Sequence, residues 1–231
     1  NTSGTIDANT VTTLTGSTAE ITSLTASTGI TFGTTVGGTI NDVSVSASAL
    51  NTLDTAAGGI IDASTVKTVT GTGTAALTAF ESSGISGLVF DASSYIAGYA
   101  DLMAAFSSDL GAARVHYFDF GVSEGRSFDA FDEASYLASY SDLLAAFGTN
   151  TDSALIHYIY NGYSEGRAVD TFDENSYLAS NSSLIGTVTD AAAHYVSTGY
   201  AAGLALDTFN EFSYIASYAD LISAFGVDGD A

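Results

Sequence analysis

A motif of the form Phe-Asp-x3-Tyr-Leu-Ala recurs along the C-terminal part of the chain, and this repetition limits the folds open to it. Copies begin at Phe90, Phe131, Phe172 and Phe209, so successive copies start 41, 41 and 37 residues apart. A unit of about 40 residues buries little apolar surface alone, and such units bury it by stacking on their neighbours. The repetition therefore predicts an array of similar units.

Each copy contains the signals of short helices. An Asp or Asn starts each helical pattern, where its side chain can accept bonds from first-turn amides: Asp91, Asp132, Asp173 and Asn210. A His-Tyr pair follows in three copies, at His116, His157 and His194, and Glu-Gly-Arg closes the first two, at Arg126 and Arg167. The fourth copy ends before its His-Tyr segment. We expect two or three short helices per copy.

The second copy shows the predicted helices most clearly. Its apolar residues recur at spacings of three and four, at Leu137, Tyr140, Leu144 and Phe147. Residues Ser153 to Tyr160 predict a further short helix, apolar on most sides and therefore buried. Gly162 lies where a left-handed C-cap would end this helix.

The region before Phe90 is rich in Thr, Ser, Ala and Gly and has few aromatic residues. It repeats as well, since the segment from Gly4 to Val11 is echoed from Gly59 to Val66, 55 residues later. The β-branched segment from Thr39 to Val45 predicts strands, and Ala47 to Leu53 predicts a short helix. Small residues at regular spacing favour a tightly coiled solenoid. The alternative is a β-sandwich, which usually has more aromatic core residues.

These patterns together predict an α+β repeat protein with two regions. Residues 1–89 are expected to form a strand-rich solenoid, or a β-sandwich in the alternative, and residues 90–231 an α-helical repeat array. The helical copies span 90–130, 131–171 and 172–208, with a truncated copy at 209–231.

The charge of the chain excludes some partners. With 26 Asp and Glu against 4 Lys and Arg, the net charge is −22. Nucleic acids and anionic membranes both need a cationic surface, so neither is an expected partner. Cations are favoured, because they relieve the self-repulsion of the folded chain. The absence of cysteine excludes disulfides and thiolate sites, and we expect no transmembrane segment because no run approaches 18 apolar residues.

Both regions resemble repeats of large secreted bacterial surface proteins, of the haemolysin-type calcium-binding and adhesin-like kind. The helical unit carries this resemblance through Phe-Asp-x3-Tyr-Leu-Ala, His-Tyr and Gly-x2-Glu-Gly-Arg. The resemblance implies an extracellular or cell-surface location and a structural or adhesive role. The calcium-binding nonapeptides of that class are absent, and only Val227-Asp228-Gly229-Asp230 is similar to them. Calcium therefore stays a candidate cofactor, with Asp228 and Asp230 as its least supported ligands.

We expect no enzymatic activity, no catalytic residue and no bound organic cofactor. No nucleophile elbow or phosphate-cradling loop occurs, and an active site is normally one asymmetric constellation rather than a repeated one. The histidines are too far apart to share a metal ion, so we expect each to be a buried imidazole that ties a helix to a neighbouring loop. The expected partners of Arg126 and Arg167 are the acids of the next copy, Asp132 and Asp173.

The predicted function is that of a structural subunit in an extracellular assembly, such as a surface layer, sheath or filament. Its main partner would be itself, through contacts between unlike ends. The truncated fourth copy is expected to leave apolar side chains uncovered: Tyr214, Ile215, Tyr218, Leu221, Ile222 and Phe225. The alternative is an adhesin-type binding module for a glycan or host surface, with a surface polysaccharide as its partner.

Overall fold

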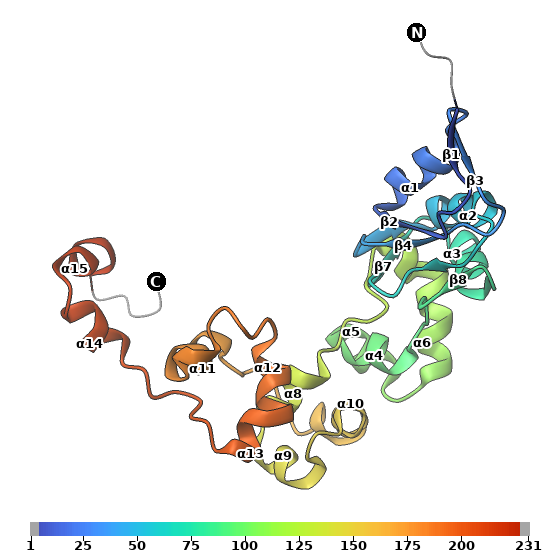
Figure 1. Cartoon of the computed structure of the whole chain (residues 1–231). Coiled ribbons are helices and arrows are strands. Elements are labelled where there is room, and N and C mark those ends of the chain that lie inside the picture. Colours follow the sequence, from blue (N-terminus) through green and yellow to red (C-terminus); the bar gives the residue numbers. More distant parts are fainter. Residues whose placement is uncertain (1–4, 227–231) are drawn as a thin grey trace. The chain divides into compact units, whose positions relative to one another are not determined.

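The computed structural model describes residues 5–226 of the chain (Figure 1). The predicted ligands Asp228 and Asp230 lie outside these residues. The chain forms two compact units that interlace along the sequence. The first contains residues 1–131 with 155–167, and the second contains 132–154 with 168–231. The second motif copy is therefore divided between the two units. Residues 155–167, which contain its His-Tyr pair and which we call its closing segment, group with the first copy. The sequence boundary after residue 89 stays a prediction.

The N-terminal part of the first unit is built from short strands and three helices. The strands are β1 (Ile6–Ala8), β2 (Thr13–Gly16), β3 (Ile30–Phe32), β4 (Gly37–Ile40), β5 (Ser44–Ser46), β6 (Ile61–Asp62), β7 (Thr68–Thr70) and β8 (Ile85–Ser86). The helices are α1 (Thr18–Thr25), α2 (Ala47–Ala56) and α3 (Gly73–Glu81), and α2 contacts both others. A serine or threonine caps each helix: Ser17, Ser46 and Thr72.

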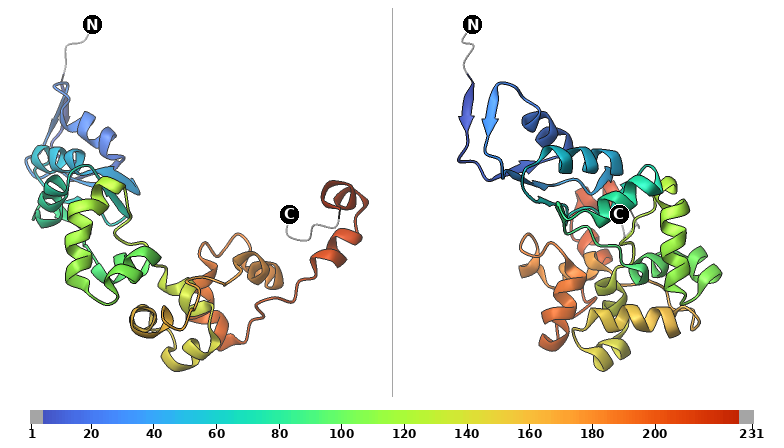
Figure 2. Two further views of the ribbon diagram at one scale, coloured as in Figure 1. Left: turned by 180° about the vertical axis from the view of Figure 1, so that it is seen from behind. Right: turned by 90° about the vertical axis from the view of Figure 1, so that its right-hand side faces the viewer.

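All strand pairs that involve these elements are parallel, in the orders β1-β3, β2-β4-β6-β8 and β5-β7. Figure 2 shows β1 and β3 side by side near the N-terminus. Paired residues lie 24 apart in sequence in most ladders, as in Ile6 with Ile30 and Ile61 with Ile85. Parallel neighbours need a long crossover, which the helices supply.

This arrangement is α/β, and it corrects the predicted α+β class for this region. The β-sandwich alternative is wrong, because sandwiches are built from antiparallel sheets and the strand ladders described here are parallel. The predicted strand segment and the predicted short helix are confirmed by β4, β5 and α2.

Glycine allows the close approach of successive strands. A Cβ atom on Gly37 in β4 would lie 2.3 Å from the carbonyl oxygen of Ile60. The layers around it are filled by fully buried aliphatic side chains that include Ile40, Leu50, Leu53 and Ile61. The small residues of this region therefore reflect backbone spacing as well as core volume.

The first motif copy completes the first unit. It contains α4 (Ala92–Ala97), α5 (Ala100–Phe106), α6 (Leu110–His116), the π-helical turn η1 (Tyr117–Gly121) and α7 (Val122–Glu124). Phe80 of α3 joins this copy to the strand region, because its ring makes edge contacts with Phe90, Tyr117, Phe118 and Phe128. The π-helical turn η2 (Tyr158–Gly162), from the second copy, contacts α4.

The second unit contains the other helical elements. They are α8 (Glu133–Ala138), α9 (Ser141–Phe147), α11 (Glu174–Ser180), the 3-10 turn η3 (Ser182–Leu184), α12 (Ala191–His194), the π-helical turn η4 (Tyr195–Gly199), α13 (Tyr200–Ala202), α14 (Glu211–Ala216) and α15 (Ala219–Phe225). Helix α10 (Thr151–His157) begins in this unit and ends in the first. The four predicted N-caps, Asp91, Asp132, Asp173 and Asn210, are confirmed. Among the described residues, no helix has the length and apolar character needed to cross a membrane.

Replacing Gly37 with alanine is expected to lower the free energy of unfolding by about 3 kcal/mol, because the new methyl group would overlap the backbone of Ile60. Gly29→Ala is the matched control, since the nearest atom to its Cβ would be 3.7 Å away. Denaturant unfolding of both variants measures the difference. Equal stabilities would contradict the close strand approach.

Candidate functional site

The first and third motif copies contain the same cluster of three residues, which we call the Tyr-His-Gly lock. The tyrosine comes from the opening helix of the copy, and the histidine and glycine come from the closing segment. In the first copy Tyr95 Oη lies 2.9 Å from His116 Nδ1, and in the third Tyr177 Oη lies 2.8 Å from His194 Nδ1. Both bonds tie the opening helix of a copy to the helix that ends at the histidine, α6 or α12.

Glycine makes room for the tyrosine hydroxyl. A Cβ atom on Gly121 would lie 2.4 Å from Tyr95 Oη, and one on Gly199 would lie 2.3 Å from Tyr177 Oη. Each glycine is the last residue of a π-helical turn that begins directly after the histidine. Such turns are rare and often lie at functional positions. Here the turn places histidine and glycine around one hydroxyl group.

The ends of the closing segments correct the prediction for Gly162. This glycine lies inside the π-helical turn η2, and the left-handed residue is Gly166, with φ of 72°. Gly125 and Gly203 play the same part in the other copies, with φ of 69° and 68°. The residue after each of these glycines completes a Schellman motif. Its amide donates to the carbonyl five residues earlier, as Arg126 N does to Gly121 O at 2.9 Å. A turn at residues 163–166 follows η2, so the left-handed residue lies four positions past the predicted one.

Aromatic rings surround each lock. Phe90 stacks on Tyr117 with centroids 4.7 Å apart, and Phe172 stacks on Tyr195 at 5.5 Å. The tyrosines of the opening helices, Tyr95 and Tyr177, are fully buried. Burial raises the pKa of both hydroxyls above the usual value. These hydroxyls are therefore held neutral and bonded inside the fold.

The histidines differ from expectation in two respects. Each is partly buried rather than inaccessible, and His116 and His194 bond a tyrosine of another helix rather than a loop. His157 lies with Nε2 4.0 Å from a carboxylate oxygen of Glu165. Within residues 5–226 no group of three or more His, Asp or Glu is arranged to hold a metal ion.

Arg126 pairs with acidic residues of its own copy, so the prediction that it pairs with Asp132 of the next copy is wrong. Its guanidinium donates to both carboxylate oxygens of Asp101, at 2.8 and 3.1 Å, and lies over the ring of Tyr99 with 4.8 Å to the centroid. This bond from Arg126 holds the pKa of Asp101 below its usual value. Asp132 instead caps α8, because it accepts from Ser135 N at 2.8 Å.

Arg167 donates through Nε to Glu165 at 2.6 Å, which matches the short bond from Arg126 Nε to Glu124. Its predicted partner Asp173 caps α11, with bonds from Ser176 N at 2.8 Å and Ser176 Oγ at 2.9 Å. The backbone amide of Ser176 lowers the pKa of the Asp173 carboxyl. The Glu-Gly-Arg triplet thus brings its own glutamate and arginine together.

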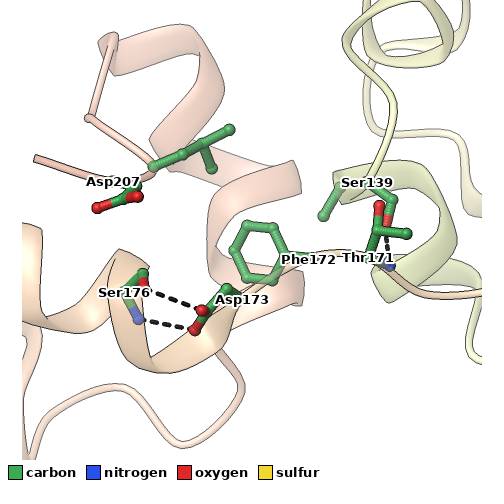
Figure 3. A pocket seen from close by; sticks show the side chains of 8 residues that line it. Ser139, Thr171, Phe172, Asp173, Ser176 and Asp207 are labelled. Carbon is green, nitrogen blue, oxygen red and sulfur yellow. Dashed lines mark hydrogen bonds between the residues drawn. The ribbon is translucent and has the colours of Figure 1, made fainter. Parts of the chain in front are cut away.

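A serine directly after the opening motif bonds the last residue of its copy, next to the start of the following copy, and it is not among the residues that the sequence analysis predicts. Ser139 Oγ accepts from Thr171 N at 2.8 Å, and Ser180 Oγ accepts from Thr208 N at 2.7 Å. Figure 3 shows Ser139 beside Thr171 at a pocket of about 200 Å³. The pocket is lined by Ala138, Ser139, Thr171, Phe172, Asp173, Ser176, Leu206 and Asp207. The recurring Ala-Ser pair at 138–139 and 179–180 is the sequence signal for this link.

Comparison with protein-family models, with curated proteins and with solved structures finds no match to this chain. The recurring geometry is therefore the basis for any functional conclusion. Its polar groups face one another: tyrosine to histidine, arginine to aspartate, and serine to backbone amide. Such an arrangement holds helices and successive motif copies together.

The double variant Gly199→Ala, Tyr177→Phe tests the lock directly. We expect Gly199→Ala to destabilise by about 2 kcal/mol through overlap with the hydroxyl and Tyr177→Phe by about 1 kcal/mol through loss of the bond to His194. Removing the hydroxyl relieves part of the overlap. The double variant should therefore lose about 1 kcal/mol less unfolding free energy than the sum of the losses in the two single variants. Strict additivity in denaturant unfolding would contradict the lock. Gly29→Ala combined with Tyr177→Phe is the additive control.

Stability should fall above about pH 10, the ordinary pKa of tyrosine. The native state raises the pKa of Tyr95, Tyr117, Tyr177 and Tyr195 by burial, so it keeps these protons when the unfolded chain begins to lose them. The stabilisation is complete below that pH and is lost as pH rises further. Unfolding midpoints between pH 8 and 12 measure the effect, with tyrosinate absorbance as the second signal. Full ionisation of all tyrosines before unfolding would contradict buried locks.

Proposed function

We propose that this chain is a structural segment of an extracellular bacterial surface assembly, in which solenoid-like units stack end to end. The strand pairing at 24-residue intervals and the lock that recurs in two motif copies support a repeated architecture. The resemblance of the motifs to those of secreted surface proteins supports the location.

The observation that carries the proposal is the exposed apolar face of the fourth copy. Tyr214, Tyr218, Ile222 and Phe225 are exposed by 50%, 51%, 49% and 41%. Ile215 is the exception, because it is buried between the helices at 8% exposure, and Leu221 is partly buried. Large apolar side chains grouped on one short helix pair usually mark an interface. We call this surface the α14–α15 face.

A contact between the α14–α15 face and a different surface of a second molecule is heterologous. Contacts of this type propagate into filaments or rings, whereas contacts between identical faces stop at dimers. The strand β1 offers one such different surface, since it pairs only with β3 among the described strands and Ile6 is 63% exposed. Open strand edges bind further strands or segments readily.

A second candidate function is an adhesin-type binding module. Two aromatic side chains of the closing segments, Phe120 and Tyr160, are exposed by 55% and 60%. Exposed rings of this kind can stack on sugar faces. A glycan that binds and is lost in Tyr160→Ala would favour this function over assembly.

The purified chain is expected to form filaments or sheets as concentration rises, seen by electron microscopy and by sedimentation velocity. Ile222→Asp should prevent assembly because it places a charge in the α14–α15 face, whereas Val115→Asp, at a side chain 60% exposed elsewhere, should assemble normally. With a net charge of −22, assembly should be stronger in calcium than in a chelator. Isolated particles at every concentration and in both conditions would contradict the proposal.

A further inference from the structure

A groove of about 600 Å³ lies in the strand region of the first unit, lined by residues of α1, α2 and β5. This volume is within the range of about 300 to 1,000 Å³ that is typical of small-molecule sites. Asp42, which lies two residues before β5, also lines it. The groove thus combines one carboxylate with residues from three neighbouring elements, and the chemistry of this lining indicates what it can bind.

The two helices contribute matching rows of residues to the groove. Each row has the form hydroxyl-Ala-x2-Thr, from Thr18 to Thr22 on α1 and from Ser48 to Thr52 on α2. Residues four apart lie on one face of a helix. Thr22 Oγ1 donates to Thr18 O at 2.7 Å, and Thr52 Oγ1 donates to Ser48 O at 2.8 Å. A hydroxyl group has one proton, so these two threonines can offer a ligand only acceptor lone pairs.

The carboxylate of Asp42 is fixed at one side of the groove. Its Oδ2 accepts from both N and Oγ1 of Thr18, each at 2.6 Å, and Thr18 is only 4% exposed. The proton of the Thr18 hydroxyl is therefore also used inside the fold. Among the described residues no donor bonds Oδ1 of Asp42. Glu20 adds a second carboxylate within electrostatic range of Asp42.

This lining favours a cation that donates hydrogen bonds. None of the residues described as lining the groove is basic or aromatic, so a sugar would find no ring to stack on and an anion no positive charge. Calcium takes about six to eight oxygen ligands, whereas the groove is lined by one carboxylate. The apolar side chains of Ala19, Val45 and Ala49 offer contacts to a short aliphatic chain instead.

We propose that this groove, which we call the α1–α2 groove, binds a primary alkylammonium group, carried by a free diamine or by a lysine side chain of another protein. A primary ammonium has three N–H donors and no acceptor, which complements the Asp42 carboxylate and the threonine lone pairs. The net charge of −22 attracts such a cation to the chain. The site goes beyond the proposed function and does not depend on assembly.

The first test is titration of the full chain with 1,5-diaminopentane, followed by two-dimensional NMR of the isotope-labelled protein. The neutral isostere 1,5-pentanediol is the matched ligand control. Physiological salt screens the attraction of the diamine to exposed carboxylates elsewhere. The diamine should shift the amides of α1, α2 and β5 saturably, and the diol should bind about tenfold more weakly or less. Equal binding of the two would overturn the proposal.

A charge variant tests the role of the carboxylate. Asp42→Asn should weaken binding of the diamine about tenfold, because a charged acceptor is replaced by a neutral one. Glu81→Gln removes one negative charge from an exposed position in α3 and should leave binding unchanged. Equal effects of the two variants would overturn the proposal, because the diamine would then respond only to the net charge of the chain.

A second variant leaves Asp42 and its bonds to α1 in place. Thr22→Val keeps the shape of the side chain but removes the oxygen, and it should weaken binding several fold. Thr78→Val is the matched control, because Thr78 Oγ1 makes the same bond to Thr74 O at 3.0 Å on α3, outside the groove. Unchanged binding by Thr22→Val would overturn the hydroxyl rows as part of the site.

Further ligands separate the two sources of the ammonium group. Tighter binding of the diamine than of N-acetyl-lysine methylamide would identify a free diamine as the ligand, and the reverse order would identify a lysine side chain. Calcium at the same concentration should not displace the diamine. Complete displacement would overturn the proposal, since it would show attraction of charge alone. Amine binding by a chain that never assembles would support this site and contradict the proposed function.

Discussion

The bond between a buried tyrosine hydroxyl and a histidine ring is the interaction on which the helical part of this chain depends. Helices of six or seven residues have little stability alone, because too few backbone bonds offset the cost of nucleation. Tyr95 and Tyr177 each reach from such a helix to a closing segment, and each hydroxyl fits against a glycine that leaves it space. The stacked rings of Phe90 with Tyr117, and their counterparts in the third copy, pack against the tyrosine of each lock.

The other contacts follow from this arrangement. Because the closing segment is held over the opening helix, Arg126 comes within reach of Asp101. The left-handed residue Gly125 ends the helical segment directly before Arg126. Ser139 and Ser180 then accept bonds from Thr171 and Thr208, the residues directly before the next copy. Phe80 connects the helical part to the strand region, whose glycines allow parallel strands to approach closely. Each contact is modest alone, and repetition makes the sum large.

The sequence predicted the local features well and the distant pairings poorly. The caps at Asp91, Asp132, Asp173 and Asn210 were predictable because a cap depends on residues two or three positions away. Parallel pairing at 24-residue intervals was not, because the visible echo of 55 residues does not match that spacing. The His-Tyr pairs are conspicuous in the sequence, but they do not point to the tyrosines that the histidines bond, which lie 17 to 21 residues earlier. The joint recurrence of Tyr, His and Gly was the signal that could have revealed the lock. Asp132 is the expected partner of Arg126 because the two lie close in the sequence, whereas folding brings Asp101, 25 residues earlier, to the guanidinium.

Native-state hydrogen exchange of the opening helices tests the account most directly. A closing segment, rather than the opening helix itself, is expected to provide the stability of each copy. In dilute solution the amides of α11, which the third lock covers, should exchange at least a hundredfold more slowly than those of α14. Helix α14 has a similar cap and the same Phe–Tyr ring contact, but no closing segment covers it among the described residues. Equal protection of α11 and α14 in the monomer would show that the lock is dispensable and would contradict the account.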